Sequence, residues 1–255
     1  MKKILGGLLI VLLVLGVGLY LTLHYFLGSI AKAGVNKFGP GITQTKVELK
    51  EAQISPISGT GTLSGFTVGN PAGWSTEDAF RLGKIHLSVE PMSFFKDHIV
   101  INELVIEQPE FNYETKIVAS NVGDILKNIE ASGSQKNQPA TDDGKPIKMV
   151  IKKLRLEGGK VRVGLGPTAM ALPMPPLVMS DIGVAEGGLT PAQVAYAIMA
   201  NVTTNVVAAT TGGMSQLGGT SGAAAVEAAK QAGEAIKGFF GGAKKTATPQ
   251  PTPAK

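Results

Sequence analysis

Ile99-Val-Ile-Asn-Glu-Leu-Val-Ile106 is the stretch of sequence that decides the fold, because its apolar residues change parity halfway along. Ile99 and Ile101 share one parity, whereas Leu104 and Ile106 share the other. A β-bulge near Asn102-Glu103 would bring all four side chains to one face of a strand. The stretch therefore predicts a bulged strand with one apolar face.

The segments before this strand alternate apolar and polar residues with a period of two. In Lys84-Ile-His-Leu-Ser-Val89, for example, the apolar side chains all fall on one face. Such alternation is typical of half-buried antiparallel strands. The sequence thus predicts an α+β protein with a strongly twisted antiparallel sheet, an open half-barrel or groove, and covering helices. Its candidate apolar groove consists of Val47, Leu49, Leu63, Phe66, Val68, Ile85, Leu87, Val89, Ile99, Ile101, Leu104 and Ile106.

A second β section follows the first. Met149 to Leu156 leads into Gly158-Gly159, and Val161 to Leu165 alternates beyond it. Two glycines between apolar runs favour a hairpin turn. Leu172 to Met179 would add an edge strand, because its prolines cannot serve a central ladder.

Helices are predicted where apolar residues recur every three or four positions. Ser120-Asn121 opens a short helix with one apolar stripe. Thr190-Pro191 opens another, with Gln193 completing the pattern of a capping box. Its stripe continues to Val206. Gly28 to Gly41 predicts a short helix that ends at Gly39-Pro40-Gly41.

The N-terminus has the features of a membrane anchor. Ile4 to Leu27 is an apolar run long enough to cross the hydrocarbon layer of about 30 Å. Lys2 and Lys3 precede it and favour a cytoplasmic N-terminus, with the rest of the chain translocated. The alternative is a cleaved signal peptide, for which Ala31-Lys32-Ala33 offers a site. The length of the run favours the retained anchor.

Composition and motifs argue against several functions. A net charge of +5 spread along 255 residues does not suggest nucleic-acid binding, and the absence of cysteine excludes disulfides and thiolate chemistry. Gly59 to Gly65 precedes a strand rather than a helix, so it lacks the context of a phosphate loop. His86 and His98 do not have metal-site spacing. The sequence therefore predicts no enzyme, no cofactor and no metal. Trp74 is read as the edge of a core rather than a recognition residue.

The motifs together resemble a known family. They run Ser55-Pro56, Gly59-Thr-Gly61-Thr-Leu63, Gly65-Phe66-Thr-Val68-Gly-Asn70-Pro71, Gly73-Trp74, Glu90-Pro91, Ile99 to Ile106, Pro109-Glu110 and Ser120-Asn121. With the anchor, this pattern resembles the AsmA-like proteins of the Gram-negative envelope over about half of the chain. The resemblance implies an inner-membrane anchor, a periplasmic β-rich groove, and a role in outer-membrane biogenesis or phospholipid traffic. It brings no catalytic residues.

The resulting organisation has six parts: an anchor at 1–30, a β-rich module at 31–130, a flexible linker at 131–146, a second β section at 147–189, C-terminal helices at 190–240 and a disordered basic tail at 241–255. Two functions remain open. The first is lipid handling through the apolar face of the sheet, with phospholipid as ligand. The second is a scaffold that self-associates through the C-terminal helices or binds envelope proteins. The alternatives differ in whether the apolar face is open or filled by helices.

Overall fold

The computed structural model describes residues 2–116, 119–133, 140, 144–164 and 169–216. Its helices are α1 (Lys2–Thr43), α2 (Asn121–Gly133), α3 (Pro191–Gln216) and the short 3₁₀ helix η1 (Pro91–Phe95). Its strands are β1 (Val47–Glu48), β2 (Glu51–Ile54), β3 (Thr60–Gly69), β4 (Asp78–Val89), β5 (Ile99–Glu107), β6 (Glu110–Tyr113), β7 (Thr115–Lys116), β8 (Ala119–Ser120), β9 (Met149–Glu157), β10 (Lys160–Val163), β11 (Met170–Pro173) and β12 (Leu177–Ile182). The predictions for Ala223 to Phe240, the tail and most of the linker lie outside the described residues.

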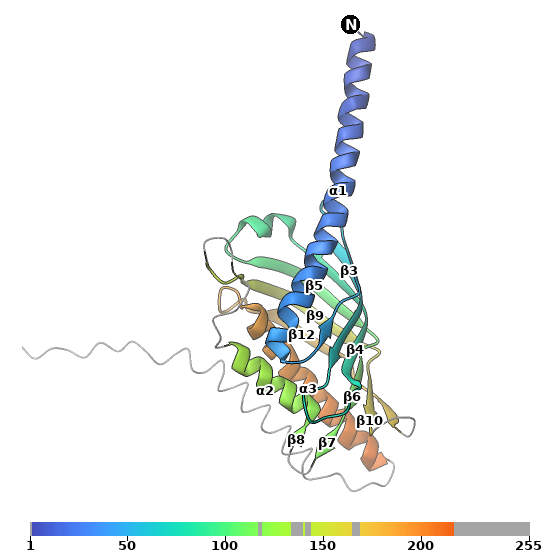
Figure 1. The fold of residues 1–255 in the computed structure, drawn as a ribbon, viewed down its shortest axis with the longest axis vertical. Helices are drawn as coiled ribbons and strands as arrows, with labels where there is room; N and C mark the ends of the chain where they lie inside the picture. Colours follow the sequence, from blue (N-terminus) through green and yellow to red (C-terminus); the bar gives the residue numbers. More distant parts are fainter. Residues whose placement is uncertain (1, 117–118, 134–139, 141–143, 165–168, 217–255) are drawn as a thin grey trace, which may run out of the picture.

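The chain is an α+β protein, as predicted, and its sheet is mixed and not a closed barrel (Figure 1). Among the described residues ten strands join one sheet, with β4 central; β3 lies along one edge of β4, while β5 and β6 share the other. The expectation of a purely antiparallel sheet is wrong, because β5 pairs with β9 and β6 with β10 in parallel. Both parallel pairs arise because the chain leaves the sheet through α2 and returns in the same direction.

The sheet changes its inward-facing residues along one line. The line crosses β3, β4, the segment from β5 to β6, and the segment from β9 to β10. In each of these four segments the inward-facing residues on the two sides of the line lie an odd number of positions apart: Leu63 and Phe66, Leu82 and Ile85, Ile106 and Phe111, Leu156 and Val161. In an unbroken strand an odd separation puts side chains on opposite faces. Gly65, Gln108 and Gly158 on this line all have positive φ, which allows the chain to turn. We call this line the fold line.

The hairpin predicted at Gly158-Gly159 is wrong. Gly158-Gly159 does not pair β9 with β10; the two strands continue past the line and pair with β5 and β6 instead. Leu172 to Met179 is likewise divided, because β11 and β12 lie at opposite ends of the sheet order. Each is an edge strand, as the prolines require, but the single strand expected there is wrong.

Substituting Gly83 tests the fold line. An added Cβ would lie 2.5 Å from the carbonyl oxygen of Glu107 on the neighbouring strand. Gly83→Ala is therefore expected to lower the free energy of unfolding by about 1–3 kcal/mol, the usual cost of overpacking. Urea unfolding of the full chain in detergent, followed by the fluorescence of the single tryptophan, measures it. Gly69→Ala is the control, because its Cβ would meet Lys46 at an ordinary 3.4 Å. Equal stability of the two variants would contradict the tight approach.

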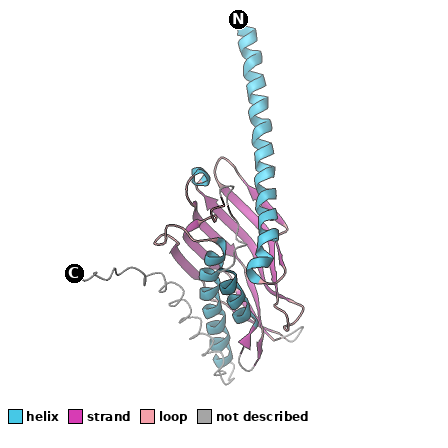
Figure 2. Ribbon diagram, turned by 60° about the vertical axis from the view of Figure 1, so that its left-hand side comes forward, coloured by secondary structure: helices cyan, strands magenta, loops and turns pink. Residues whose placement is uncertain are grey.

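Helix α1 is continuous from the apolar run to Thr43, so the predicted short helix is part of α1 and the end predicted at Gly39-Pro40-Gly41 comes a few residues early. Pro40 lies in the last turn, and the helix ends three residues after it, at Thr43. Its neighbour Gly39 is a contact residue rather than a stop, since an added Cβ would lie 2.7 Å from the Val47 side chain. The first part of α1 projects beyond the sheet and the last part packs on it (Figures 1 and 2).

Helices α2 and α3 form as their stripes predict. Val122, Ile125 and Ile129 of α2 are buried, as are Val202 and Val206 of α3. The capping box is also confirmed: the Thr190 amide donates to Gln193 Oε1 at 2.9 Å, and the Gln193 amide donates to Thr190 Oγ1 at 3.4 Å. Helix α3 runs from Pro191 to Gln216, within the range 190–240 expected for the C-terminal helices.

Candidate functional site

The pairing register brings the predicted groove residues of β3, β4 and β5 to one face. Leu63, Ile85 and Ile106 are cross-strand partners in one row, and Leu87 pairs with Leu104 in the next. The predicted bulge is confirmed: Ser88 pairs with Glu103 but Val89 pairs with Ile101, which leaves Asn102 as the extra residue. The bulge adds Ile101 to the apolar face, as expected.

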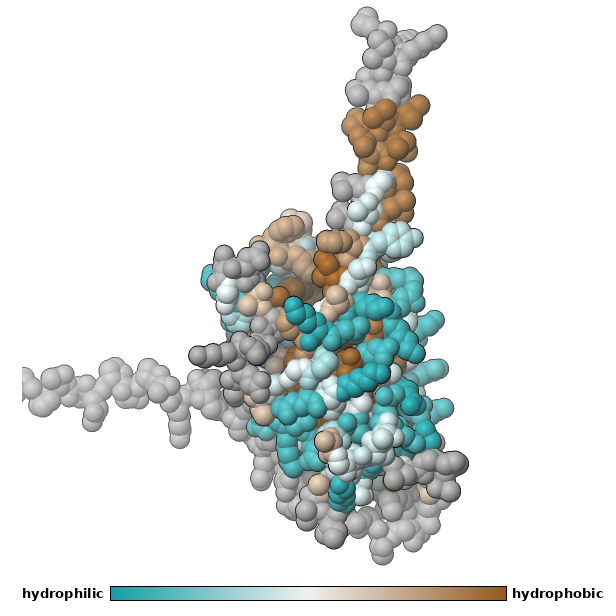
Figure 3. Space-filling view, in the orientation of Figure 1, coloured by the Kyte–Doolittle hydropathy of each residue, from teal (hydrophilic) through white to brown (hydrophobic). Residues whose placement is uncertain are grey.

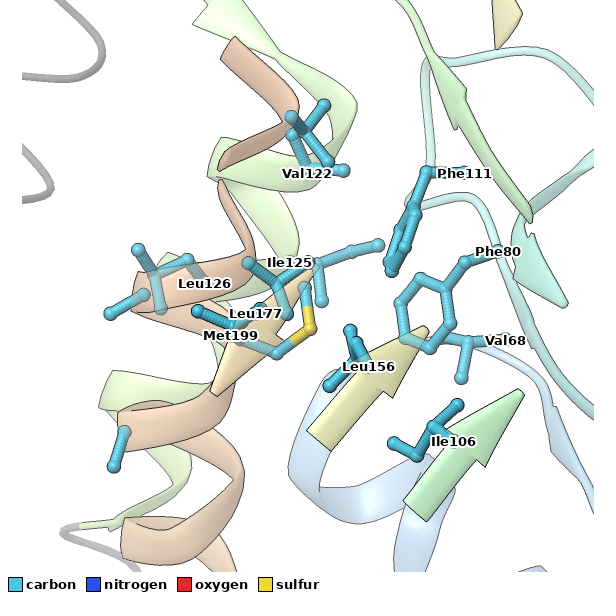
Figure 4. Close-up of a cluster of buried hydrophobic side chains, with 14 of the residues drawn as sticks. Val68, Phe80, Ile106, Phe111, Val122, Ile125, Leu126, Leu156, Leu177 and Met199 are labelled. Carbon is cyan, nitrogen blue, oxygen red and sulfur yellow. The ribbon is translucent and has the colours of Figure 1, made fainter. Parts of the chain in front are cut away.

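One part of this face is filled by helices. Figure 4 shows Val68, Phe80, Ile106, Phe111 and Leu156 of the sheet opposite residues of α2 and α3. Those helix residues include Val122, Ile125, Leu126 and Met199. The rings of Phe80 and Phe111 pack at 5.7 Å between centroids. This part of the face is an ordinary hydrophobic core.

The other part is less covered. Leu63, Leu87, Ile101 and Leu104 are half-buried, although they continue the same apolar face. We call these four residues the proximal face, because they lie near the end of the sheet from which α1 projects: Leu63 pairs with Ala52 of β2, which α1 contacts through Gly28. Figure 3 shows apolar surface at that end of the domain, beside α1. The predicted groove is therefore divided into a filled part and a partly exposed one.

The remaining groove residues fall into three groups. Val47 and Val68 pair with each other and belong to the core, as does the half-buried Phe66 beyond the fold line. Leu49 is completely buried against α1 rather than on the groove. Val89 is buried at the end of β4, and Ile99 is half-buried at the start of β5.

Helix α1 is held on the sheet by a side chain that imitates a strand. The Leu49 amide donates to Asn36 Oδ1 at 2.7 Å, and Asn36 Nδ2 donates to the Leu49 carbonyl at 3.2 Å. Two turns earlier Gly28 is buried so close to β2 that a Cβ would lie 2.1 Å from the Ala52 carbonyl oxygen. The projecting apolar segment is thus joined rigidly to the sheet.

A polar cluster that sequence patterns did not reveal lies at the other end of the domain. Asn121 is completely buried at the start of α2; its Nδ2 donates to Asn70 Oδ1 at 2.8 Å, and its Oδ1 accepts from the Glu114 amide at 3.0 Å. The Glu114 carboxylate in turn accepts from Asn70 Nδ2 at 2.6 Å and from the Ser75 amide at 3.1 Å. These bonds tie the β3–β4 loop to α2, so the cluster is structural.

Trp74 belongs to the same loop. Its Nε1 donates to Asp124 Oδ2 at 2.9 Å in the first turn of α2, and the ammonium of Lys116 lies 4.5 Å from its ring centroid. The half-buried ring fastens the loop to the helix, in keeping with its predicted place at a core edge.

His86 lies outside the apolar face. His86 Nδ1 is 3.3 Å from the Thr62 hydroxyl, and its Nε2 is 3.5 Å from Glu107 Oε1 on the outer face of the sheet. The His86 and Glu107 side chains are 45% and 49% exposed, so water screens their interaction. Within the described residues no group of three or more His, Asp or Glu side chains is placed to hold a metal.

Two buried tyrosines have perturbed acidities. Burial raises the pKa of Tyr113, against a smaller opposing effect of its hydrogen bond with Ser120. Burial also raises the pKa of Tyr196, with a further contribution from Glu130. Both phenols therefore stay neutral at physiological pH and act as packing residues.

The described part of the chain thus defines a class: an α+β protein whose single helix of membrane-spanning length, Ile10–Thr43, is docked on a mixed sheet with a partly exposed apolar face. The chain matches no family model, no curated protein and no solved structure.

Proposed function

We propose that this chain is a non-catalytic single-pass membrane protein that binds the acyl chains of phospholipids on its proximal face. Helix α1 crosses the inner membrane with Lys2 and Lys3 in the cytoplasm, and the sheet stands in the periplasm as a twisted open groove. The protein serves outer-membrane biogenesis or lipid handling, in line with its resemblance to the AsmA-like proteins.

One observation carries this proposal: the apolar face runs without interruption from the filled core to the partly exposed proximal face. Leu63, Leu87 and Leu104 remain half-buried although neighbours on the same strands, such as Ile85 and Ile106, are almost completely covered. Exposed aliphatic surface costs about 25 cal/mol for each Å² left in water. An acyl chain entering from the adjacent bilayer would cover this surface without refolding the protein.

Copurified lipid tests the proposal. Leu104→Gln is expected to reduce the phospholipid retained by the purified full chain several-fold, as measured by mass spectrometry of the extract. The matched control is Val105→Gln, because Val105 pairs with His86 on the outer face of the same strand. The amount of lipid that is retained only because it surrounds α1 should be the same in the two variants. Equal retention in two variants of equal stability would refute acyl-chain binding at the proximal face.

Self-association through α3 is less well supported. The stripe that suggested it, with Val194, Val202 and Val206, is buried in the core of the same chain. A scaffold function would have to use another face of α3.

A further inference from the structure

Four exposed apolar side chains of the sheet domain gather at one end, while Met170, Val178 and Val184 are exposed elsewhere on it. Phe95 is 85% exposed, Ile57 77%, Met92 65% and Phe94 55%. Met92, Phe94 and Phe95 belong to η1, and Ile57 to the turn between β2 and β3. We call these four residues the apolar tip.

The two segments of the apolar tip are neighbours. Between them lies Gly59, whose added Cβ would meet the Pro91 side chain at 3.0 Å, and the Val89 amide donates to the Gly59 carbonyl at 2.9 Å. The turn that carries Ile57 also follows β2 directly, and β2 is the strand that Gly28 of α1 contacts. The apolar tip therefore stands close to the level at which α1 leaves the sheet, and Figures 1 and 2 both show η1 at that end.

Helix η1 is built to hold its apolar side chains outward. Its polar residue Ser93 is completely buried, and its hydroxyl donates to the Glu90 carbonyl at 2.5 Å. The same hydroxyl accepts from the Val100 amide at 2.9 Å. This arrangement reverses the usual one, in which aromatic rings turn inward and serine faces water. The tip is thus a fixed apolar projection.

The neighbouring part of α1 indicates what covers the tip. Tyr25 and Phe26 are 73% and 59% exposed one turn before Gly28, where aromatic rings suit a membrane interface. On the sheet side of Tyr25 lies a depression of about 410 Å³, whose charged lining residues are Lys32, Lys50 and Glu51. Apolar side chains backed by lysines are typical of a surface that enters the headgroup layer of a membrane.

We infer that the apolar tip inserts into the same leaflet from which α1 emerges, as a second membrane contact of the domain. The occupant is a phospholipid surface, and the inference rests on the proposed membrane span of α1. Two contacts fix the tilt of the domain, so that the proximal face opens toward the bilayer. Rings of an interfacial segment lie about 5–10 Å into the headgroup and acyl boundary.

Labelling at single cysteines tests the inference, because the chain has none of its own. The full chain is reconstituted into vesicles of phosphatidylethanolamine and phosphatidylglycerol, with an environment-sensitive fluorophore at Phe95→Cys. Doxyl groups on the lipid are expected to quench this label several-fold more than a label at Lys160→Cys on β10, beyond the fold line. A third label, at Leu15→Cys, reports whether α1 itself is in the bilayer.

The outcomes separate the tip from the anchor. Quenching at positions 95 and 15 but not at 160 supports the second contact. Quenching at position 15 alone overturns the second contact but supports the membrane span of α1. Absence of quenching at position 15 overturns both the second contact and the membrane span. The label at position 95 could instead report an apolar environment that increases with protein concentration, without quenching by doxyl lipid. That result would assign the apolar tip to a contact with a second copy of the chain and would also overturn the inference. Phe94→Ser in the Ile57→Cys background is expected to weaken quenching of that label.

Discussion

Gly28→Ala is expected to detach α1 from the sheet, even though alanine favours a helix more than glycine does. The added methyl group would lie 2.1 Å from the Ala52 carbonyl oxygen, which belongs to the backbone of β2 and cannot rotate away. The helix must therefore move outward. Asn36 lies on the same docked segment, so its bonds to the Leu49 amide and carbonyl lengthen or break.

The readout is hydrogen exchange at the Leu49 amide in the full chain in detergent. We expect a protected amide in the natural protein and faster exchange in Gly28→Ala. Gly34→Ala is the matched control, because nothing lies within 4 Å of its added Cβ. That substitution should stabilise the helix by about 0.5–1 kcal/mol. Faster exchange of the Leu49 amide in Gly28→Ala but not in Gly34→Ala would establish that α1 is docked through Gly28. Equal exchange rates in the two variants would contradict it.

Local patterns accounted for much of the fold. The stripe of Val122, Ile125 and Ile129 predicts α2 because burial of one helix face repeats every three or four residues. The parity change around Asn102 predicts the bulge for an equally local reason. Thr190 and Gln193 define a helix start through bonds that span one turn. Each of these features depends on residues close together in the chain.

Patterns of pairing were harder to predict. Gly158-Gly159 favours a hairpin only if the next strand returns to pair with the last one. In the structure every residue pair between β5 and β9 and between β6 and β10 joins residues fifty positions apart, such as Ile101 with Ile151 and Phe111 with Val161. The segment from β5 to β6 and the segment from β9 to β10 are alike at this offset of fifty residues, and a search for internal repeats would use that similarity. Whether β9 and β10 pair with each other or with β5 and β6 depends on strands far away in the sequence.

The candidate site was predicted in part for the same reason. Alternation identified the apolar face, including Leu63, Leu87 and Leu104, because the face repeats within each strand. It could not distinguish these half-buried residues from the filled part of the face, since that difference depends on where α2 and α3 pack. The polar cluster around Asn121 was also missed. Its members come from three separate segments: Asn70 and Ser75 from the β3–β4 loop, Glu114 after β6, and Asn121 at the start of α2.

Asn121→Ala is expected to cause the largest loss of stability among the substitutions of buried polar residues. Asn121 is completely buried, and its Nδ2 donates both to Asn70 Oδ1 at 2.8 Å and to the Asn112 carbonyl at 2.7 Å. Its Oδ1 accepts from the Glu114 amide at 3.0 Å. Alanine leaves all three partners without this side chain, and two of them, Asn112 and Glu114, are buried. Since each unsatisfied group costs about 1–3 kcal/mol, the free energy of unfolding should fall by about 3 kcal/mol or more.

Asn128→Ala supplies the comparison within the same helix. Asn128 Nδ2 makes one part-buried bond, to the Thr43 carbonyl at 2.9 Å, so its loss should cost about 1 kcal/mol. Trp74 reports both variants in urea, because its indole is bonded to Asp124 of α2. If Asn121→Ala costs no more than Asn128→Ala, the cluster does not hold the loop. The expected excess would instead show that the β3–β4 loop, α2 and the filled part of the sheet unfold together, because Asn121 joins them through bonds that water cannot replace.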